Sequence, residues 1–195
     1  MNTTILSVTP LAVPLYVVTG VLFIAGLAKL RSPSATAGSL RELNVPSPLL
    51  AARLLGAYEV VLAAVAILTG HPLAWAGVGL SYLGFTGFVW WALGDSSRVG
   101  SCGCFGREDT PATTGHLIFN AVASAIALLS VLTPVELSSF EGSAFEAFLT
   151  VVLVAVAVVL SIVALTLLPR TLAATKSGSQ PMVTQFALTS NGPKE

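Results

Sequence analysis

The sequence predicts an all-α integral membrane protein, a helical bundle with five transmembrane helices. Two observations support this fold class. Of the 195 residues, 54% are hydrophobic and only 9% are charged, whereas a soluble globular domain carries about 25% charged residues. In addition, five apolar stretches each approach the roughly 20 residues that a helix needs to cross a bilayer. The first predicted partner of the chain is therefore the lipid bilayer.

The predicted helices are connected in ways that the sequence makes explicit. The second and third are separated only by Gly70, His71 and Pro72, so we expect a tight helical hairpin. The fifth is rich in Val, Ala and Leu, and we expect Pro169 and Arg170 to end it. One bundle domain over 1–170 and a disordered polar tail over 171–195 follow from this reading. The predicted spans are 11–30, 49–69, 73–93, 115–132 and 145–168.

Tryptophans mark both ends of the third predicted helix. Trp75 opens the helix, and Trp90 and Trp91 close it. Indole rings favour the membrane–water interface. We therefore expect these side chains to lie in two interfacial belts.

The basic residues predict an orientation in the inner (plasma) membrane. With five spans, every Lys and Arg falls on one face, whereas the loops of the other face carry only His71, Glu136 and Glu141. Basic loops stay in the cytoplasm, so the N-terminus is expected outside and the C-terminus inside. A net charge of zero gives no basic surface for nucleic acid. The basic residues are Lys29, Arg31, Arg41, Arg53, Arg98, Arg107, Arg170, Lys176 and Lys194.

The most reactive segment is the Cys102–Gly103–Cys104 sequence between the third and fourth helices. A disulfide closed across one residue is a small, strained ring, and strain makes it easier to reduce. The pair therefore suits thiol–disulfide exchange better than cross-linking. Nearby positive charge favours the thiolate, which is the reactive form. The candidates for this role are Arg98, Arg107 and Arg53.

His116, at the start of the fourth helix, is a candidate proton donor or acceptor for this chemistry. The alternative is an interfacial histidine without a chemical role. Cys102, Cys104 and His116 could instead bind zinc or copper, and a homo-oligomer of two chains could form a four-Cys site. One Cys-x-Cys without a second cluster is a weak metal signal, so metal binding remains an alternative to redox chemistry.

Glu59 is the one carboxylate expected near the middle of a span. A charge at that depth is costly, and it indicates a functional site by default. Its partners on other helices could be Lys29 or Asn120, although Lys29 could extend to the interface instead. Two interpretations remain open, a proton relay or quinone contact on one side and an interhelical hydrogen bond that fixes packing on the other.

At this point the residues resemble a known family. The first helix and polar positions of the second resemble DoxX and MauE membrane proteins, and the cysteine loop resembles the MauE branch in particular. The resemblance covers roughly 11–132. The positions that carry it are Gly20–Leu30, Pro33, Arg53, Gly56, Glu59, Cys102–Gly106 and Asn120.

The resemblance implies a DoxX-like four-helix core with a fifth helix added. MauE, named for methylamine utilisation, is thought to support processing, transport or disulfide maturation of the methylamine dehydrogenase small subunit. DoxX and DoxD relatives are linked to thiol, thiosulfate and quinone redox chemistry. The implied partners are thus a thioredoxin-like protein or a client protein, and the implied cofactor is a quinone.

We therefore favour a thiol–disulfide oxidoreductase that uses Cys102 and Cys104. Three alternatives remain open: a non-enzymatic assembly factor, a quinone-linked thiosulfate oxidoreductase subunit, and a metal-handling protein. Maturation of an exported subunit needs thiol chemistry outside the cytoplasm, yet the charge pattern puts the cysteine loop inside. Either a cytoplasmic thioredoxin-like donor supplies electrons, or the orientation is reversed.

Overall fold

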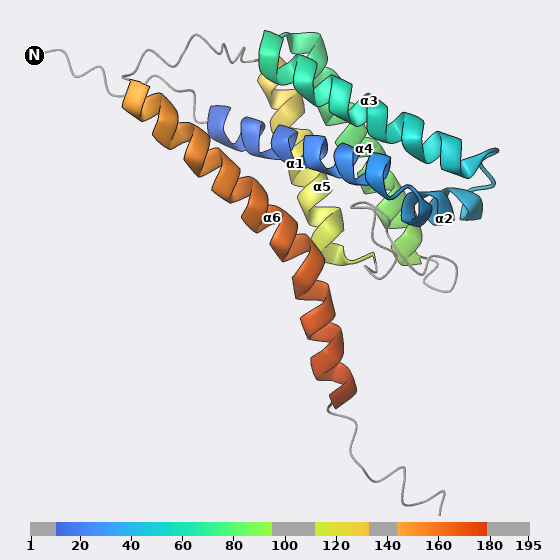
Figure 1. Cartoon of the computed structure of the whole chain (residues 1–195). Helices are drawn as coiled ribbons and strands as arrows, with labels where there is room; N and C mark the ends of the chain where they lie inside the picture. Colours follow the sequence, from blue (N-terminus) through green and yellow to red (C-terminus); the bar gives the residue numbers. More distant parts are fainter. Residues whose placement is uncertain (1–10, 95–111, 133–143, 179–195) are drawn as a thin grey trace, which may run out of the picture.

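The computed structural model describes residues 11–94, 112–132 and 144–178, with the side chains of the last range described up to residue 167. Within these ranges the chain forms six α-helices and no strand (Figure 1). Five of them are long and apolar enough to cross a membrane, which confirms the predicted five-span bundle. The helices that contain these spans are α1 (Ala12–Arg31), α3 (Pro48–Thr69), α4 (Pro72–Gly94), α5 (Thr114–Leu132) and α6 (Ala144–Gly178). In α6 the apolar span is Ala144–Leu167.

A short helix that the sequence analysis did not predict, α2 (Ser34–Glu42), joins α1 to α3. Pro33 accounts for the break before it. A residue that precedes a proline is pushed out of the helical region, and Ser32 has φ −135° and ψ 74°. The chain then restarts as α2 directly after the proline and packs against α3.

The hairpin between α3 and α4 is as tight as predicted. Gly70 ends α3 in the left-handed conformation, with φ 61°, and its N–H donates to the carbonyl of Ala66. Glycine adopts this conformation without a steric penalty. Pro72 then occupies the first position of α4, where its missing N–H costs no helical hydrogen bond.

The prediction that Pro169 and Arg170 end the last helix is wrong. The helix α6 continues through them to Gly178, so 171–178, assigned to the polar tail, are helical. Proline removes one backbone donor from a helix, and the hydrogen bonds on either side can carry the helix past it with a kink. The axis of α6 changes direction in its C-terminal part (Figure 1). The predicted disorder of 179–195 lies outside the described residues.

The helices pack as two close pairs, α1 with α3 and α4 with α5, and α6 lies mainly against α1 (Figure 1). The core between the pairs is centred on Trp75, Leu15, Leu22 and Val78, all fully or almost fully buried. Most of the described side chains of α6, those of residues 144–167, are exposed or partly exposed, as expected for a helix whose surface faces lipid.

The prediction that Trp75 lies in an interfacial belt is also wrong. Its side chain is fully buried, its ring packs edge-on against Tyr16 with centroids 6.1 Å apart, and its Nε1 donates to the carbonyl of Gly70 at 3.0 Å. The exposed end of the hairpin supplies the acceptor that the indole needs, so the ring can enter the core. Trp90, at the other end of α4, is 71% exposed.

Candidate functional site

The site begins with a close crossing of α1 and α3 at two glycines. A Cβ added to Gly26 would lie 2.8 Å from the carbonyl oxygen of Gly56, and one added to Gly56 would lie 2.9 Å from that of Gly26. Small residues are what permit two membrane helices to approach so closely. Lys29 follows Gly26 by three residues and Glu59 follows Gly56 by three, so both side chains emerge beside the crossing.

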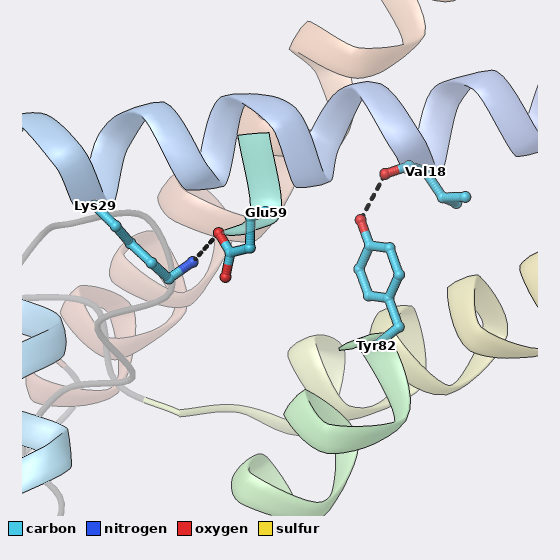
Figure 2. Close-up of polar contacts among 4 residues, drawn as sticks. All are labelled: Val18, Lys29, Glu59 and Tyr82. Carbon is cyan, nitrogen blue, oxygen red and sulfur yellow. Dashed lines mark hydrogen bonds and ion pairs between the residues drawn. The ribbon is translucent and has the colours of Figure 1, made fainter. Parts of the chain in front are cut away.

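Lys29 and Glu59 form a buried ion pair beside this crossing. Lys29 Nζ donates to Glu59 Oε2 at 2.8 Å, and the two residues are 3% and 0% exposed (Figure 2). The sequence analysis gives Lys29 and Asn120 as possible partners of Glu59, and in the structure the partner is Lys29. The ammonium also lies 5.3 Å from the centre of the Phe85 ring. Because a lone charge at this depth is costly, each ion requires the other.

Only one of the two carboxylate oxygens of Glu59, Oε2, takes part in the ion pair with Lys29. Its Oε1 is buried and has no hydrogen-bond partner among the described residues. A buried carboxylate oxygen is normally satisfied by protein or ordered water. The ion pair therefore leaves an acceptor for a water molecule or for another donor.

Tyr82 ties the second helix pair to the first. Its hydroxyl donates to the carbonyl oxygen of Val18 at 2.6 Å, from α4 to α1 (Figure 2). Its ring stands edge-on to Phe85 and Phe119, with centroids 6.2 Å and 6.1 Å away. Ser124 makes a comparable link within the α4–α5 pair, donating to the Gly79 carbonyl at 2.9 Å. These bonds hold α4 and α5 in place beside the ion pair.

His116 lies in the first turn of α5 and is 2% exposed. Thr113 positions it through two contacts: its Oγ1 accepts from the backbone N–H of His116 at 3.4 Å and lies 2.8 Å from the ring Nδ1. The first contact is the usual N-cap interaction of threonine. The other ring nitrogen, Nε2, is buried and has no partner among the described residues. A buried imidazole with one unpaired nitrogen can pass a proton or bind a polar group.

The polar groups of α1 and α5 meet in one pocket between α1, α4, α5 and α6. It leaves about 30 Å³ for the centres of water molecules, enough for about two waters. Most of its wall is aliphatic or aromatic, and its polar side chains gather from three helices. The pocket is lined by Val21, Leu22, Ala25, Lys29, Tyr82, Phe85, His116, Phe119, Asn120 and Leu165.

Three residues that the sequence singled out, Lys29, His116 and Asn120, therefore line the same pocket, and Glu59 is held next to it by Lys29. Arg53 is exposed, on the second turn of α3. The proposed roles of Cys102, Cys104, Arg98 and Arg107 concern positions outside the described residues. Within the described parts of the chain, no group of three His, Cys, Asp or Glu side chains could hold a metal ion.

Sequence reasoning missed two contributors to the site, Phe85 and Thr113. Both had a signal. Thr113 precedes His116 by three residues, the spacing at which an N-cap side chain reaches back into the first turn. Phe85 follows Tyr82 by three residues, so the two rings share a helix face.

Comparison with models of protein families places the chain beside a known family. The model of the family described as methylamine utilisation protein MauE matches residues 7–133, more than half of the chain. This range includes α1 to α5 and the whole pocket except Leu165. No curated protein and no solved structure matches the chain.

Proposed function

The chain belongs to the MauE family of membrane proteins, and from this membership we propose that it exchanges thiols and disulfides through Cys102 and Cys104. One observation carries the proposal. The Cys-Gly-Cys sequence lies in the connection from Gly94, the end of α4, to Thr114, the start of α5. The first turn of α5 bears the buried His116, so the connection is attached directly to the polar pocket.

The exchange is balanced in sulfur, electrons and protons. One cysteine thiolate attacks a sulfur of a partner disulfide, forms a mixed disulfide and releases the partner's other sulfur as a thiolate. The second cysteine loses its proton and attacks the mixed disulfide, which closes the Cys102–Cys104 bond and releases the partner as a dithiol. Two electrons pass to the partner. The reverse sequence oxidises a partner dithiol and leaves both cysteines reduced.

The charged and titratable side chains support this chemistry. Arg98 and Arg107 flank the cysteines in the sequence, and Arg53 is exposed near the start of α3, so all three favour the thiolate. His116 takes up or returns the proton of the attacking thiol, for which an imidazole is suited near neutral pH. The three arginines thus stabilise the thiolate, His116 handles the proton, and the sulfur atoms of Cys102 and Cys104 exchange the bonds.

The cysteine loop is proposed to face the cytoplasm, in an inner membrane. Five spans put the two ends of the bundle on opposite sides, and the basic residues gather on the side of the cysteine loop. A thioredoxin-like protein in the cytoplasm is then the electron donor to the pair. The implied client, the methylamine dehydrogenase small subunit, would be reached through a further carrier. A loop on the outer side would instead meet such a client directly.

Trapping of the mixed disulfide tests the proposal. With the resolving cysteine removed, as in Cys104→Ser or Cys102→Ser, one of the two variants should accumulate a covalent complex that a reductant dissolves. Ser101→Ala, adjacent to the pair, is the matched control and should behave as the wild type. The variant with both cysteines replaced should form no complex.

The functional readout separates exchange from assembly. In a host that grows on methylamine, the double variant Cys102→Ser/Cys104→Ser should lose the correct disulfide pairing of the client, because a pair that receives electrons from a thioredoxin-like donor reduces wrongly paired disulfides. Full client maturation by this variant would overturn the exchange mechanism and favour the assembly factor. A metal that co-purifies with the wild type and is lost from the double variant would favour metal handling instead.

A further inference from the structure

Two buried polar atoms at the pocket between α1, α4, α5 and α6 have no hydrogen-bond partner among the described residues. The first is His116 Nε2, on a side chain that lines the pocket and is 2% exposed. The second is Glu59 Oε1, on a fully buried side chain whose other oxygen is bonded to Lys29, itself part of the pocket wall. Buried polar atoms are normally satisfied by protein or by ordered water. Both atoms therefore need a partner that the described side chains do not supply.

The size and the lining of the pocket both fit water. The pocket leaves about 30 Å³ for the centres of water molecules, enough for about two of them. A purely apolar cavity stays dry, whereas a buried water needs about two to four polar partners. The side chains of His116, Asn120 and Lys29 line this pocket, and Glu59 Oε1 adds an acceptor next to Lys29. Two water molecules that also bond to each other therefore find enough partners here.

The hydrogen-bond roles at the two ends of such a water bridge agree with each other. The ionised carboxylate of Glu59 can only accept, so each water donates toward Glu59 and the water beside His116 accepts from Nε2–H. On the other side of the ring, Thr113 Oγ1 accepts the backbone N–H of His116 at 3.4 Å and lies 2.8 Å from Nδ1. The hydroxyl proton of Thr113 is then available to Nδ1. Both contacts favour the same neutral tautomer, with the ring proton on Nε2 and a lone pair on Nδ1.

We propose that the pocket binds two water molecules that join His116 Nε2–H to Glu59 Oε1, and that Glu59 thereby holds the imidazole in this tautomer. The hydrogen bond at one ring nitrogen decides which nitrogen can accept a proton, and a carboxylate stabilises the imidazolium that forms. Glu59 is thus a positioning residue, and Lys29 keeps it ionised. The use of the imidazole rests on the proposed thiol exchange, in which the proton of the attacking cysteine moves to Nδ1 and later returns.

Nuclear magnetic resonance of the imidazole tests the bridge without any turnover. The chain has two histidines, so His71→Asn leaves His116 as the single imidazole, and the asparagine can still accept the Leu73 N–H that His71 binds. The parent protein for the test is the full chain with His71→Asn, Cys102→Ser and Cys104→Ser, labelled with ¹⁵N-histidine in detergent micelles at slightly alkaline pH. The proposal predicts a proton on Nε2, none on Nδ1, and a cross-peak between Nε2–H and water that has the sign of a dipolar contact and not that of chemical exchange.

Variants of the parent protein separate Glu59 from Thr113 as the cause of the tautomer. Lys29→Leu/Glu59→Leu removes the carboxylate without leaving a buried charge. It should lower the ratio of the Nε2–H to the Nδ1–H tautomer about tenfold, the size of one hydrogen bond to a charged group. Thr113→Val removes the hydroxyl and should leave Nε2–H the main form. Ser124→Ala is the matched control, because it removes a buried hydroxyl of the same helix that bonds to Gly79 instead, and it should leave the ratio unchanged.

Any of four results would overturn the proposal: a ring proton on Nδ1 in the parent protein, no dipolar contact between Nε2–H and water, an unchanged ratio in Lys29→Leu/Glu59→Leu, or a switch to Nδ1–H in Thr113→Val. If the double leucine variant fails to fold, the other three measurements decide. The cysteine-free background keeps the two proposals apart. A bridge found here together with failed disulfide trapping would leave the bridge standing and remove the exchange mechanism. Successful trapping without the water contact would remove the bridge alone.

Discussion

Replacement of Gly56 by alanine should separate α1 from α3 and weaken the fold at the ion pair. The new Cβ would lie 2.9 Å from the Gly26 carbonyl oxygen and 3.0 Å from Lys29 Cβ, whereas ordinary contact begins at 3.4 Å. The two helices must therefore move apart by about half an ångström, and overpacking of this kind typically costs about 1–3 kcal/mol. The 2.8 Å bond between Lys29 and Glu59, one turn away, is stretched by the same movement.

Gly84→Ala is the matched control for this prediction. It places the same methyl group in a helix interior, where a Cβ at Gly84 has nothing within 4 Å. There the substitution should be neutral or stabilising by about 0.5–1 kcal/mol, because alanine loses less backbone entropy than glycine. The difference between the two variants should thus be about 1–4 kcal/mol.

The assay is unfolding by SDS in mixed micelles, followed by tryptophan fluorescence, for the wild type and both variants. A free energy of unfolding for Gly56→Ala below that of Gly84→Ala by the stated amount supports the glycine crossing. Equal stabilities would refute it, because two helices in contact at Gly26 and Gly56 cannot accept a methyl group without cost.

Two other substitutions test the polar contacts of the site in the same assay. Glu59→Gln leaves the Lys29 ammonium buried without its counter-ion and should cost about 3–5 kcal/mol. The double variant Lys29→Leu/Glu59→Leu removes both charges and should recover most of that loss, so an equally unstable double variant would contradict the ion-pair argument. Tyr82→Phe keeps the ring in place but removes its bond to a main-chain carbonyl of α1, which should cost about 0.5–1.5 kcal/mol. An unchanged stability for this variant would show that the 2.6 Å contact adds nothing to the fold.

Apolar length predicted the five spans because a bilayer selects helices by length and composition before any packing occurs. Where tertiary contacts decide, the same reasoning failed. Trp75 was assigned to the interface because indoles favour it, yet the Gly70 carbonyl satisfies its N–H inside the bundle. The sequence analysis expects Pro169 to end the last helix, but α6 continues past it, because the loss of one backbone N–H donor does not by itself end a helix.

In the polar site, too, the sequence predicts what depends on composition and fails to predict what depends on how the helices pack. Glu59 was identified from its depth in a span, which the sequence specifies directly. The choice between Lys29 and Asn120 as the partner of Glu59 depends on where and at what angle α1 crosses α3. That geometry cannot be derived from the sequence alone. The equal spacing of Gly26 to Lys29 and of Gly56 to Glu59 was the available signal, since two small residues that meet carry the following turn of each helix together.

The central claim, that Cys102 and Cys104 cycle between thiols and a disulfide, is tested most directly by maleimide labelling in intact cells. A membrane-permeant and an impermeant reagent are compared before and after mild reduction, and labelling is read as a mass shift of the whole chain. The account predicts labelling by the permeant reagent alone, with two labels gained on reduction. Labelling by the impermeant reagent would show that the cysteine loop faces the outside, which contradicts the proposed orientation. Cysteines that remain reduced under every growth condition would contradict the claim itself.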